Sequence, residues 1–145
     1  MAANNARRIS LGAQWRHRLS SSKQAEAQPP LPADLDQSRL AFYSGHLCER
    51  GTDTAMYDYA DCAESVLGLT SYVFYDVDSP DNFEGCVEKF RARFGDRLIG
   101  VPAFDAVDAL LVSNRIANLY LIKIVDDKNV SRAPGVRTLV HAVFF

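Results

Sequence analysis

The stretch SGHLCERGTDTA (residues 44–55) separates two segments of different periodicity. Before it, RLAFYS (residues 39–44) is a short apolar run, which is typical of a buried strand. After it, DTAMYDYADCAESVLG (residues 53–68) places apolar side chains at helical spacing and ends on a glycine, where a C-terminal cap belongs. The stretch therefore predicts a strand, a loop and a helix that begins near Gly51 and Thr52.

The same alternation continues along the chain. Further strands are predicted in SYVFYDV (71–77), RLIGV (97–101), LYLIKIV (119–125) and RTLVHAVFF (137–145). A second helix follows Ser79-Pro80-Asp81, with Ser79 as its N-cap, and Asp105 can cap a third. Strands that are apolar throughout and alternate with helices indicate a parallel sheet covered on both faces. We therefore expect one α/β domain over residues 38–145, a Rossmann-like three-layer sandwich with a mainly parallel sheet.

The first 37 residues differ in composition from the rest. Residues 1–33 contain five basic residues and one acid, whereas the remainder contains 11 basic and 17 acidic residues. This segment is rich in Ala, Ser and Gln, and it cannot bury enough apolar surface to fold alone. Leu11, Trp15 and Leu19 would form one apolar stripe beside arginines if the segment were helical. Residues 1–37 are thus predicted to be a disordered basic tail or, as the alternative, an organelle transit peptide.

Composition limits the function classes. A chain of 145 residues with 48% hydrophobic residues forms one domain rather than two. The net charge of −2 argues against a nucleic-acid partner, and no apolar run is long enough for a membrane span. The cysteines Cys48, Cys62 and Cys86 match no metal or redox spacing, which favours reduced thiols in an intracellular protein. We expect a cytoplasmic location, with organelle import through the tail as the alternative.

Ligands of open α/β sheets bind beyond the carboxyl ends of the strands, which directs attention to the loop after the first strand. The backbone N–H groups of Gly51, Thr52 and Asp53 could bind a phosphate with help from the helix dipole. The alternative is an ordinary turn in which Thr52 is the N-cap. Glu49 and Asp53 weaken the phosphate interpretation because they place negative charge there.

Three more residues are candidates. Lys123, at the end of an apolar strand, either reaches water or meets an anionic ligand. His141 in the last strand is either a hydrogen-bonded core residue or a catalyst. His46 lies beside Cys48, but a His-x-Cys pair without further ligands is not a metal site, so no metal is expected. The residues alone indicate a phosphate- or nucleotide-binding α/β domain without a defined reaction.

Longer segments carry a resemblance. LAFYSGHLCERGTDTAMYDYADCAESVLG, YVFYDVDS, KFRARFG, LYLIK and VRTLVHAVF together resemble the N-terminal half of a family of glycosyltransferase-like proteins. These are similar to retaining sugar transferases of two-domain GT-B architecture. The match runs from about Arg39 to Phe145, and its most specific part is the RGT followed by A-x-Y-D-Y-A in residues 50–60.

The resemblance implies transfer of a sugar from a nucleotide-sugar donor to a glycan or other hydroxyl acceptor, without a metal or other cofactor. It implies that the Gly51-Thr52 turn approaches the donor diphosphate and that His141 is catalytic, near the transferred sugar. Lys123 matches a lysine of the family, and His46 joins it, Gly51 and Thr52 as a donor-binding candidate. The following VDDKNVSRAPG replaces an expected glycine-containing turn, so Asp126, Asp127 and Asn129 receive no role.

In such enzymes a C-terminal domain holds most of the donor, commonly through an E-x7-E motif. We expect the isolated chain to be inactive, and the apolar ending VFF suggests half of something larger, either truncated or a gene-model fragment. The expected partner is then a C-terminal domain or a separate chain. Two alternatives remain, a non-catalytic sugar- or nucleotide-binding module and a dinucleotide-binding domain. For the latter Asp76 would hold a ribose, although Gly45 and Gly51 do not form a G-x-G-x-x-G motif.

Overall fold

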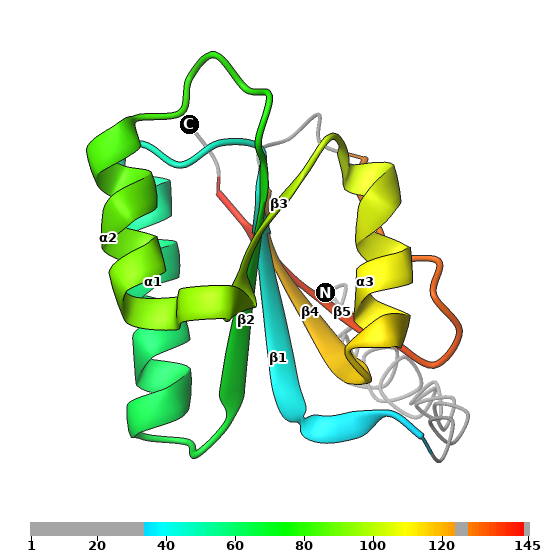
Figure 1. Ribbon diagram of the computed structural model, residues 1–145. Helices are drawn as coiled ribbons and strands as arrows, with labels where there is room; N and C mark the ends of the chain where they lie inside the picture. The colour runs from blue at the N-terminus through cyan, green and yellow to red at the C-terminus, as the bar shows by residue number, and fades with distance from the viewer. Residues whose placement is uncertain (1–33, 124–127, 144–145) are drawn as a thin grey trace, which may run out of the picture.

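The centre of the molecule is a five-stranded sheet in the order β3-β2-β1-β4-β5, in which every neighbouring pair is parallel (Figure 1). The computed structural model describes residues 34–123 and 128–143. In chain order the elements are β1 (Asp36–Ser44), α1 (Gly51–Ser65), β2 (Thr70–Asp76), α2 (Glu84–Phe94), η1 (Gly95–Arg97), β3 (Leu98–Val101), η2 (Phe104–Ala106), α3 (Val107–Ser113), β4 (Ile116–Lys123) and β5 (Arg137–Ala142).

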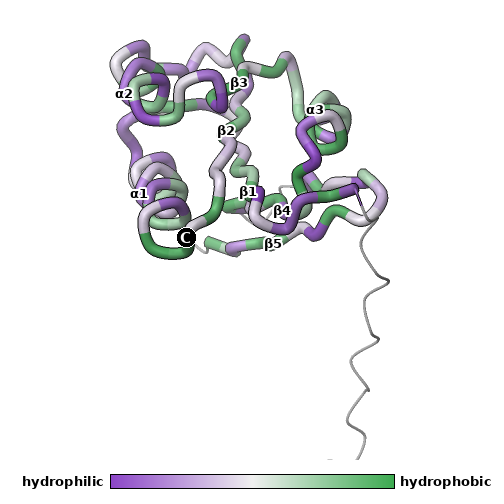
Figure 2. Tube along the Cα trace, turned by 60° about the horizontal axis from the view of Figure 1, so that its bottom comes forward, coloured by the Kyte–Doolittle hydropathy of each residue, from purple (hydrophilic) through white to green (hydrophobic). Residues whose placement is uncertain are grey.

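Helices cover both faces of the sheet, so the predicted α/β fold with a parallel sheet in a three-layer arrangement is confirmed. Helices α1 and α2 pack on one face and α3 on the other, as the view along the sheet makes clear (Figure 2). β1 lies at the centre, with β2 on one side and β4 on the other. The strands that follow β1 in the sequence are added first on one side of it (β2, β3) and then on the other (β4, β5). The strand order therefore reverses between β1 and β4, and this is the position where doubly wound sheets bind ligands.

Two apolar cores result from the alternation of side chains along the strands. Phe42 of β1 packs with residues of α1 and α2, whereas its neighbours Ala41 and Tyr43 pack with residues of α3 on the other face. All three side chains are buried. This burial on both faces explains why RLAFYS is apolar, and it fixes the position of the strand end from which the next loop starts.

The structure corrects two of the predicted helix starts. Ser79 is not the N-cap of α2, because the helix begins at Glu84 and its N-cap residue is Phe83. The N–H of Phe83 donates to the carbonyl oxygen of Leu47 at 2.8 Å, and Phe83 itself is in an extended conformation. Asp105 lies within η2, and α3 begins only at Val107 without a side-chain cap.

β5 differs from the expected buried strand. Within the described part of the chain it forms an edge of the sheet, pairs only with β4, and leaves Leu139 and Val140 about half exposed. Beside it, a mostly apolar groove of about 510 Å³ runs between α1 and the sheet. The groove is lined by Leu40, Phe42, Tyr59, Cys62, Ala63, Val66, Leu67 and Tyr120. The predicted apolar strand is therefore present, but five of its six residues are exposed among the described residues.

The ends of the chain lie partly outside the described residues. The predicted tail or transit peptide covers residues 1–37, and its first 33 residues lie outside the described part of the chain. Residues 124–127 and 144–145 also lie outside it. β1 starts at Asp36, so two residues that the sequence analysis placed in the tail belong to the domain. Among the helices of the described part, none combines the length and the apolar character needed to cross a membrane.

Candidate functional site

A pocket of about 270 Å³ lies at the carboxyl ends of β1 and β4, where the strand order reverses. The loop of residues 45–50 and the first turn of α1 close it on one side. It is lined by Tyr43, Ser44, Gly45, His46, Thr52, Asp53, Met56, Leu121, Ile122, Lys123 and Asn129. The position is the one that the sequence analysis expected for a ligand of an open α/β sheet.

Three of the predicted donor-binding residues meet in this pocket. His46 comes from the loop after β1, Thr52 from the first turn of α1, and Lys123 from the last position of β4. Lys123 also donates a hydrogen bond from Nζ to the carbonyl oxygen of Asn129, a second lining residue. The fold therefore brings together residues that lie up to 77 positions apart in the sequence.

Gly51 is the first residue of α1, next to the pocket but not part of its lining. Its φ is not positive, and a Cβ placed on it would meet no atom within 4 Å. The backbone here does not require glycine, unlike at Gly95, whose φ is 57°. A turn conformation that needs a positive φ is thus excluded at Gly51.

The start of α1 offers two backbone amides. The first intrahelical hydrogen bonds run from the N–H groups of Asp53 and Thr54 to the carbonyl oxygen of Arg50, each at 3.1 Å. The amides of Gly51 and Thr52 precede this ladder, whereas the amide of Asp53 is already used. Arg50, and not Thr52, is the N-cap residue, and no side chain caps the helix there.

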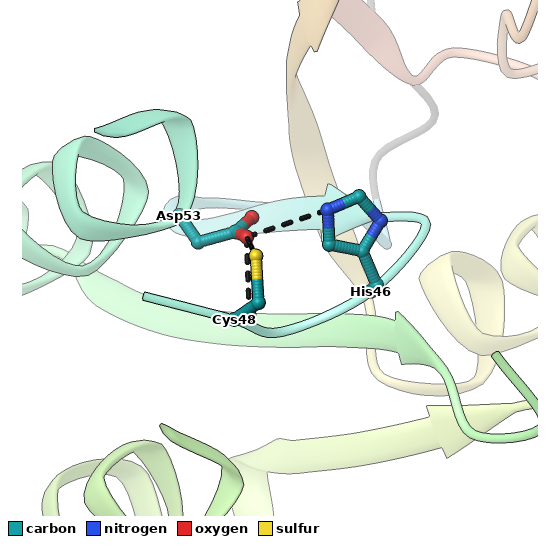
Figure 3. A group of neighbouring side chains, drawn as sticks. All are labelled: His46, Cys48 and Asp53. Carbon is teal, nitrogen blue, oxygen red and sulfur yellow. Dashed lines mark hydrogen bonds and ion pairs between the residues drawn. The ribbon is translucent and has the colours of Figure 1, made fainter. Parts of the chain in front are cut away.

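The carboxylate of Asp53, a lining residue of the pocket, points toward the side chains of His46 and Cys48 (Figure 3). The residue is only 2% exposed, and its Oδ1 accepts a hydrogen bond from the hydroxyl of Ser44 at 2.9 Å. Its Oδ2 accepts from both the backbone N–H and the thiol of Cys48, each at 3.1 Å. The Nε2 of His46 lies 3.6 Å from the same oxygen. Asp53 thus links the end of β1, the loop and the helix.

The loop is anchored from a second direction. The N–H of Leu47 donates to the side-chain oxygen of Asn82 at 2.8 Å, and the N–H of Phe83 returns a hydrogen bond to Leu47. The amide nitrogen of Asn82 donates to the carbonyl oxygen of Asp76, at the end of β2. The segment that carries His46 and Cys48 is therefore held by α1 on one side and by residues 82–83 on the other.

The two buried cysteines near the site are kept as thiols. Burial raises the pKa of Cys48, and the adjoining Asp53 carboxylate raises it further. Burial likewise raises the pKa of Cys86, whose thiol donates to the carbonyl oxygen of Cys48 at 3.3 Å. None of the three cysteines of the chain is in a disulfide. Neither buried thiol is therefore an activated nucleophile in this environment.

His141 lies apart from the pocket lining. It is exposed on β5, and its Nδ1 is 3.0 Å from the hydroxyl oxygen of Tyr120. Its ring also lies near that of Tyr59 on α1, with 6.2 Å between the centroids. In the β4–β5 register His141 is the partner of Ile122, which does line the pocket. The predicted catalytic residue is thus one strand away from the predicted binding residues and belongs to an aromatic cluster.

Sequence reasoning gave no role to Ser44 and rejected the His46–Cys48 pair as a metal site. It considered Asp53 as a backbone donor to a phosphate and as an unfavourable charge, but not as a buried hydrogen-bond acceptor. A signal for Asp53 was present, since it falls on the same helical stripe as the buried residues Met56, Ala60 and Ala63. An acid in register with an apolar stripe must find partners inside the fold, because burying an unpaired charge is costly.

Comparison with known proteins found no family model that matches this chain, and no match among curated proteins or solved structures.

Proposed function

We propose that this domain binds the phosphate groups of a nucleotide sugar in the pocket between β1 and β4, as the N-terminal half of a glycosyltransferase-like protein. The observation that carries the proposal is the convergence of His46, Thr52 and Lys123 on one pocket at the point where the strand order reverses. These residues come from three separate elements, the loop after β1, the first turn of α1 and the end of β4.

The chemistry of the pocket suits an anion. Lys123 supplies a positive charge, Thr52 a hydroxyl, and the start of α1 supplies amides and the positive end of the helix dipole. The negative charge of Asp53 opposes this, but its oxygens accept hydrogen bonds from Ser44 and Cys48 and are nearly inaccessible. A phosphate would therefore meet these donors in the same pocket, and the hydrogen bonds that Asp53 accepts reduce the repulsion from its carboxylate.

The size of the pocket supports a shared site. Its volume of about 270 Å³ lies just below the range of roughly 300–1,000 Å³ that is usual for enclosed small-molecule sites. A nucleotide sugar would fill it only in part, so a second domain or chain would have to enclose the rest. Transfer also needs the leaving diphosphate to be stabilised in a site without water. We therefore propose that the isolated chain binds such a donor weakly and is inactive in transfer.

Binding by the full chain tests the proposal. UDP-glucose, GDP-mannose and inorganic pyrophosphate are titrated by calorimetry or NMR against the wild-type chain, Lys123→Gln and Arg91→Gln. Arg91 is the matched control, because it is an exposed cation on α2. Lys123→Gln should weaken binding at least about 10-fold, as expected for a charge-assisted hydrogen bond, and Arg91→Gln should leave it unchanged. Equal losses in both variants, or no binding of any of the three compounds, would overturn the proposal.

Further binding and transfer measurements separate the alternatives. A dinucleotide-binding domain would bind NADH, seen as enhanced fluorescence, and nucleotide sugars would not displace it. A non-catalytic module would bind the nucleotide sugar but transfer nothing even when a C-terminal domain from a GT-B enzyme is supplied. In the active assembly, His141→Ala should lower the rate on the order of 10²–10³-fold, as for loss of one transition-state hydrogen-bond donor.

A further inference from the structure

We propose that His46, Cys48 and Asp53 form a binding site for a divalent zinc-like ion. The side chains of these residues offer three ligand atoms that lie within 4.8 Å of one another (Figure 3). The sequence showed only the His-x-Cys pair, and α1 brings Asp53 to it as the third ligand. The inference does not depend on the proposed function, because it concerns the ion alone.

The distances suit a tetrahedral ion. Zinc bonds of about 2.0–2.3 Å place two ligand atoms roughly 3.4–3.6 Å apart across a tetrahedral angle. Here the Sγ of Cys48 lies 3.1 Å from the Oδ2 of Asp53, and the Nε2 of His46 lies 3.6 Å from the same oxygen. These two separations lie within about half an ångström of the tetrahedral values, and all three ligand atoms lie within 4.8 Å of one another. Nitrogen, sulfur and carboxylate oxygen are also the ligand types that zinc accepts.

The surroundings hold the ligands in position. The hydroxyl of Ser44 donates to Oδ1 of Asp53, the oxygen that does not face the other two ligands, and so orients the carboxylate. The backbone N–H of Cys48 donates to Oδ2, and the thiol of Cys86 donates to the carbonyl oxygen of Cys48. These hydrogen bonds do not use the sulfur of Cys48 as a donor and can persist when the ion binds.

Binding would exchange one interaction for others. The thiol of Cys48 now donates a hydrogen bond to Asp53, and metal binding would replace it by sulfur–metal and oxygen–metal bonds. The proton leaves to solvent, and the ion offsets the negative charges of the thiolate and the carboxylate. His46 and Asp53 line the pocket, so a fourth coordination position would open toward it. Three protein ligands with one open position is the arrangement of a reactive rather than a purely structural zinc site.

The test uses the full chain and the metals alone. Co²⁺ is titrated first, because a thiolate ligand gives an intense near-ultraviolet charge-transfer band, and Zn²⁺ is then added in competition. The variants are Cys48→Ser and His46→Gln, with Cys62→Ser and His17→Gln as controls. Cys62 is an exposed cysteine on α1, and His17 belongs to the N-terminal segment, so both report on adventitious binding. Serine at position 48 keeps a hydroxyl that can donate to Asp53, so this variant should fold.

We expect one equivalent of Co²⁺ to produce the thiolate band, and Zn²⁺ to abolish it and raise the melting temperature. Cys48→Ser should lose the band, and His46→Gln should weaken Zn²⁺ binding by at least about 100-fold, the upper end of what even an indirect partner contributes. Both controls should behave as the wild type. A band that survives in Cys48→Ser or disappears in Cys62→Ser, or the absence of one-to-one binding, would overturn the inference. Because no nucleotide is present, none of these outcomes bears on the proposed function.

Discussion

The Oδ2 atom of Asp53 accepts hydrogen bonds from both the backbone N–H and the thiol of Cys48, each at 3.1 Å. One side chain of α1 thus holds one side of the loop that leaves β1, and Asn82 and Phe83 hold the other side. Since that loop carries His46 and borders the pocket, the position of the candidate site depends on a buried carboxylate. The same residue serves the fold and, in our proposals, the chemistry.

Replacing Asp53 should therefore destabilise the domain. In Asp53→Asn an NH₂ group replaces one carboxylate oxygen, so at least one of the donors that now point at Asp53 loses its acceptor. We expect a loss of about 2–3 kcal/mol in the free energy of unfolding, the scale of a hydrogen bond to a charged group together with an unmet buried donor. Urea denaturation followed by circular dichroism measures it.

The matched control is Asp58→Asn on the same helix. Asp58 is exposed, so this variant should change the free energy of unfolding by less than about 0.5 kcal/mol. If the two variants unfold at the same urea concentration, the hydrogen bonds of Asp53 do not stabilise the loop in the way described.

A second prediction concerns acid. Burial alone would raise the pKa of Glu64, but hydrogen bonds from Arg97, from the N–H of Ser71 and from Arg93 outweigh it and lower the pKa. A carboxyl whose pKa is lower in the folded state stabilises the fold above its unfolded pKa of about 4.3. This stabilisation is lost as the pH falls through the folded pKa.

Glu64→Gln removes this titration. The variant should be less stable than the wild type at neutral pH, and the difference in melting temperature should shrink as the pH falls below about 4.3. Melting curves between neutral pH and the acid limit of folding measure the trend. A difference that stays constant over this range would mean that the ionised form of Glu64 has no preference for the folded state.

The sequence predicted the order and type of the elements well, because each strand at the centre of the sheet is apolar on both faces. Its boundaries were less accurate, since hydrogen bonds to distant residues decide them. β1 extends back to Asp36, whose N–H donates to the carbonyl oxygen of Arg115 at 2.7 Å. The start of α2 was misplaced for the same reason, because Leu47 holds Phe83 outside the helix. Neither of these two hydrogen bonds can be predicted from the local hydropathy pattern.

The candidate site was predictable in part. The rule that ligands bind at the carboxyl ends of parallel strands placed His46, Thr52 and Lys123 at one edge, and the structure brings them to one pocket. The position of His141 beside Tyr120 was not predictable, because it depends on the edge position of β5 and on which face its side chains occupy. The triad of His46, Cys48 and Asp53 was not predictable either, because the three side chains meet only through the path that the loop takes into α1.

A third prediction concerns the apolar groove beside β5. Val66 and Leu67 line it and are 74% and 68% exposed, so the full chain should bind a hydrophobic dye or self-associate. Leu67→Glu should reduce dye fluorescence without lowering the melting temperature. Val112→Glu, at an exposed position on α3 that faces away from the groove, should leave the fluorescence unchanged. Equal dye binding by both variants would show that the groove is not the apolar surface that the dye contacts.

The last prediction separates the role of Gly51 as backbone from its role beside a ligand. A Cβ at Gly51 meets no atom within 4 Å and the residue has no positive φ, so Gly51→Val should keep the melting temperature close to that of the wild type. Gly95 ends α2 with a φ of 57°, and Gly95→Val should cost more than about 1 kcal/mol of unfolding free energy. If a diphosphate approaches the amides of Gly51 and Thr52, the bulk of valine at position 51 should weaken binding of UDP-glucose or GDP-mannose at unchanged stability.

Gly95→Val should show the reverse, because the strained residue lies at the far end of α2 and away from the pocket lining. Calorimetric binding measured beside thermal melting on both variants distinguishes these patterns, and a Gly51→Val chain that binds as tightly as the wild type would exclude an approach of the phosphates to the start of α1.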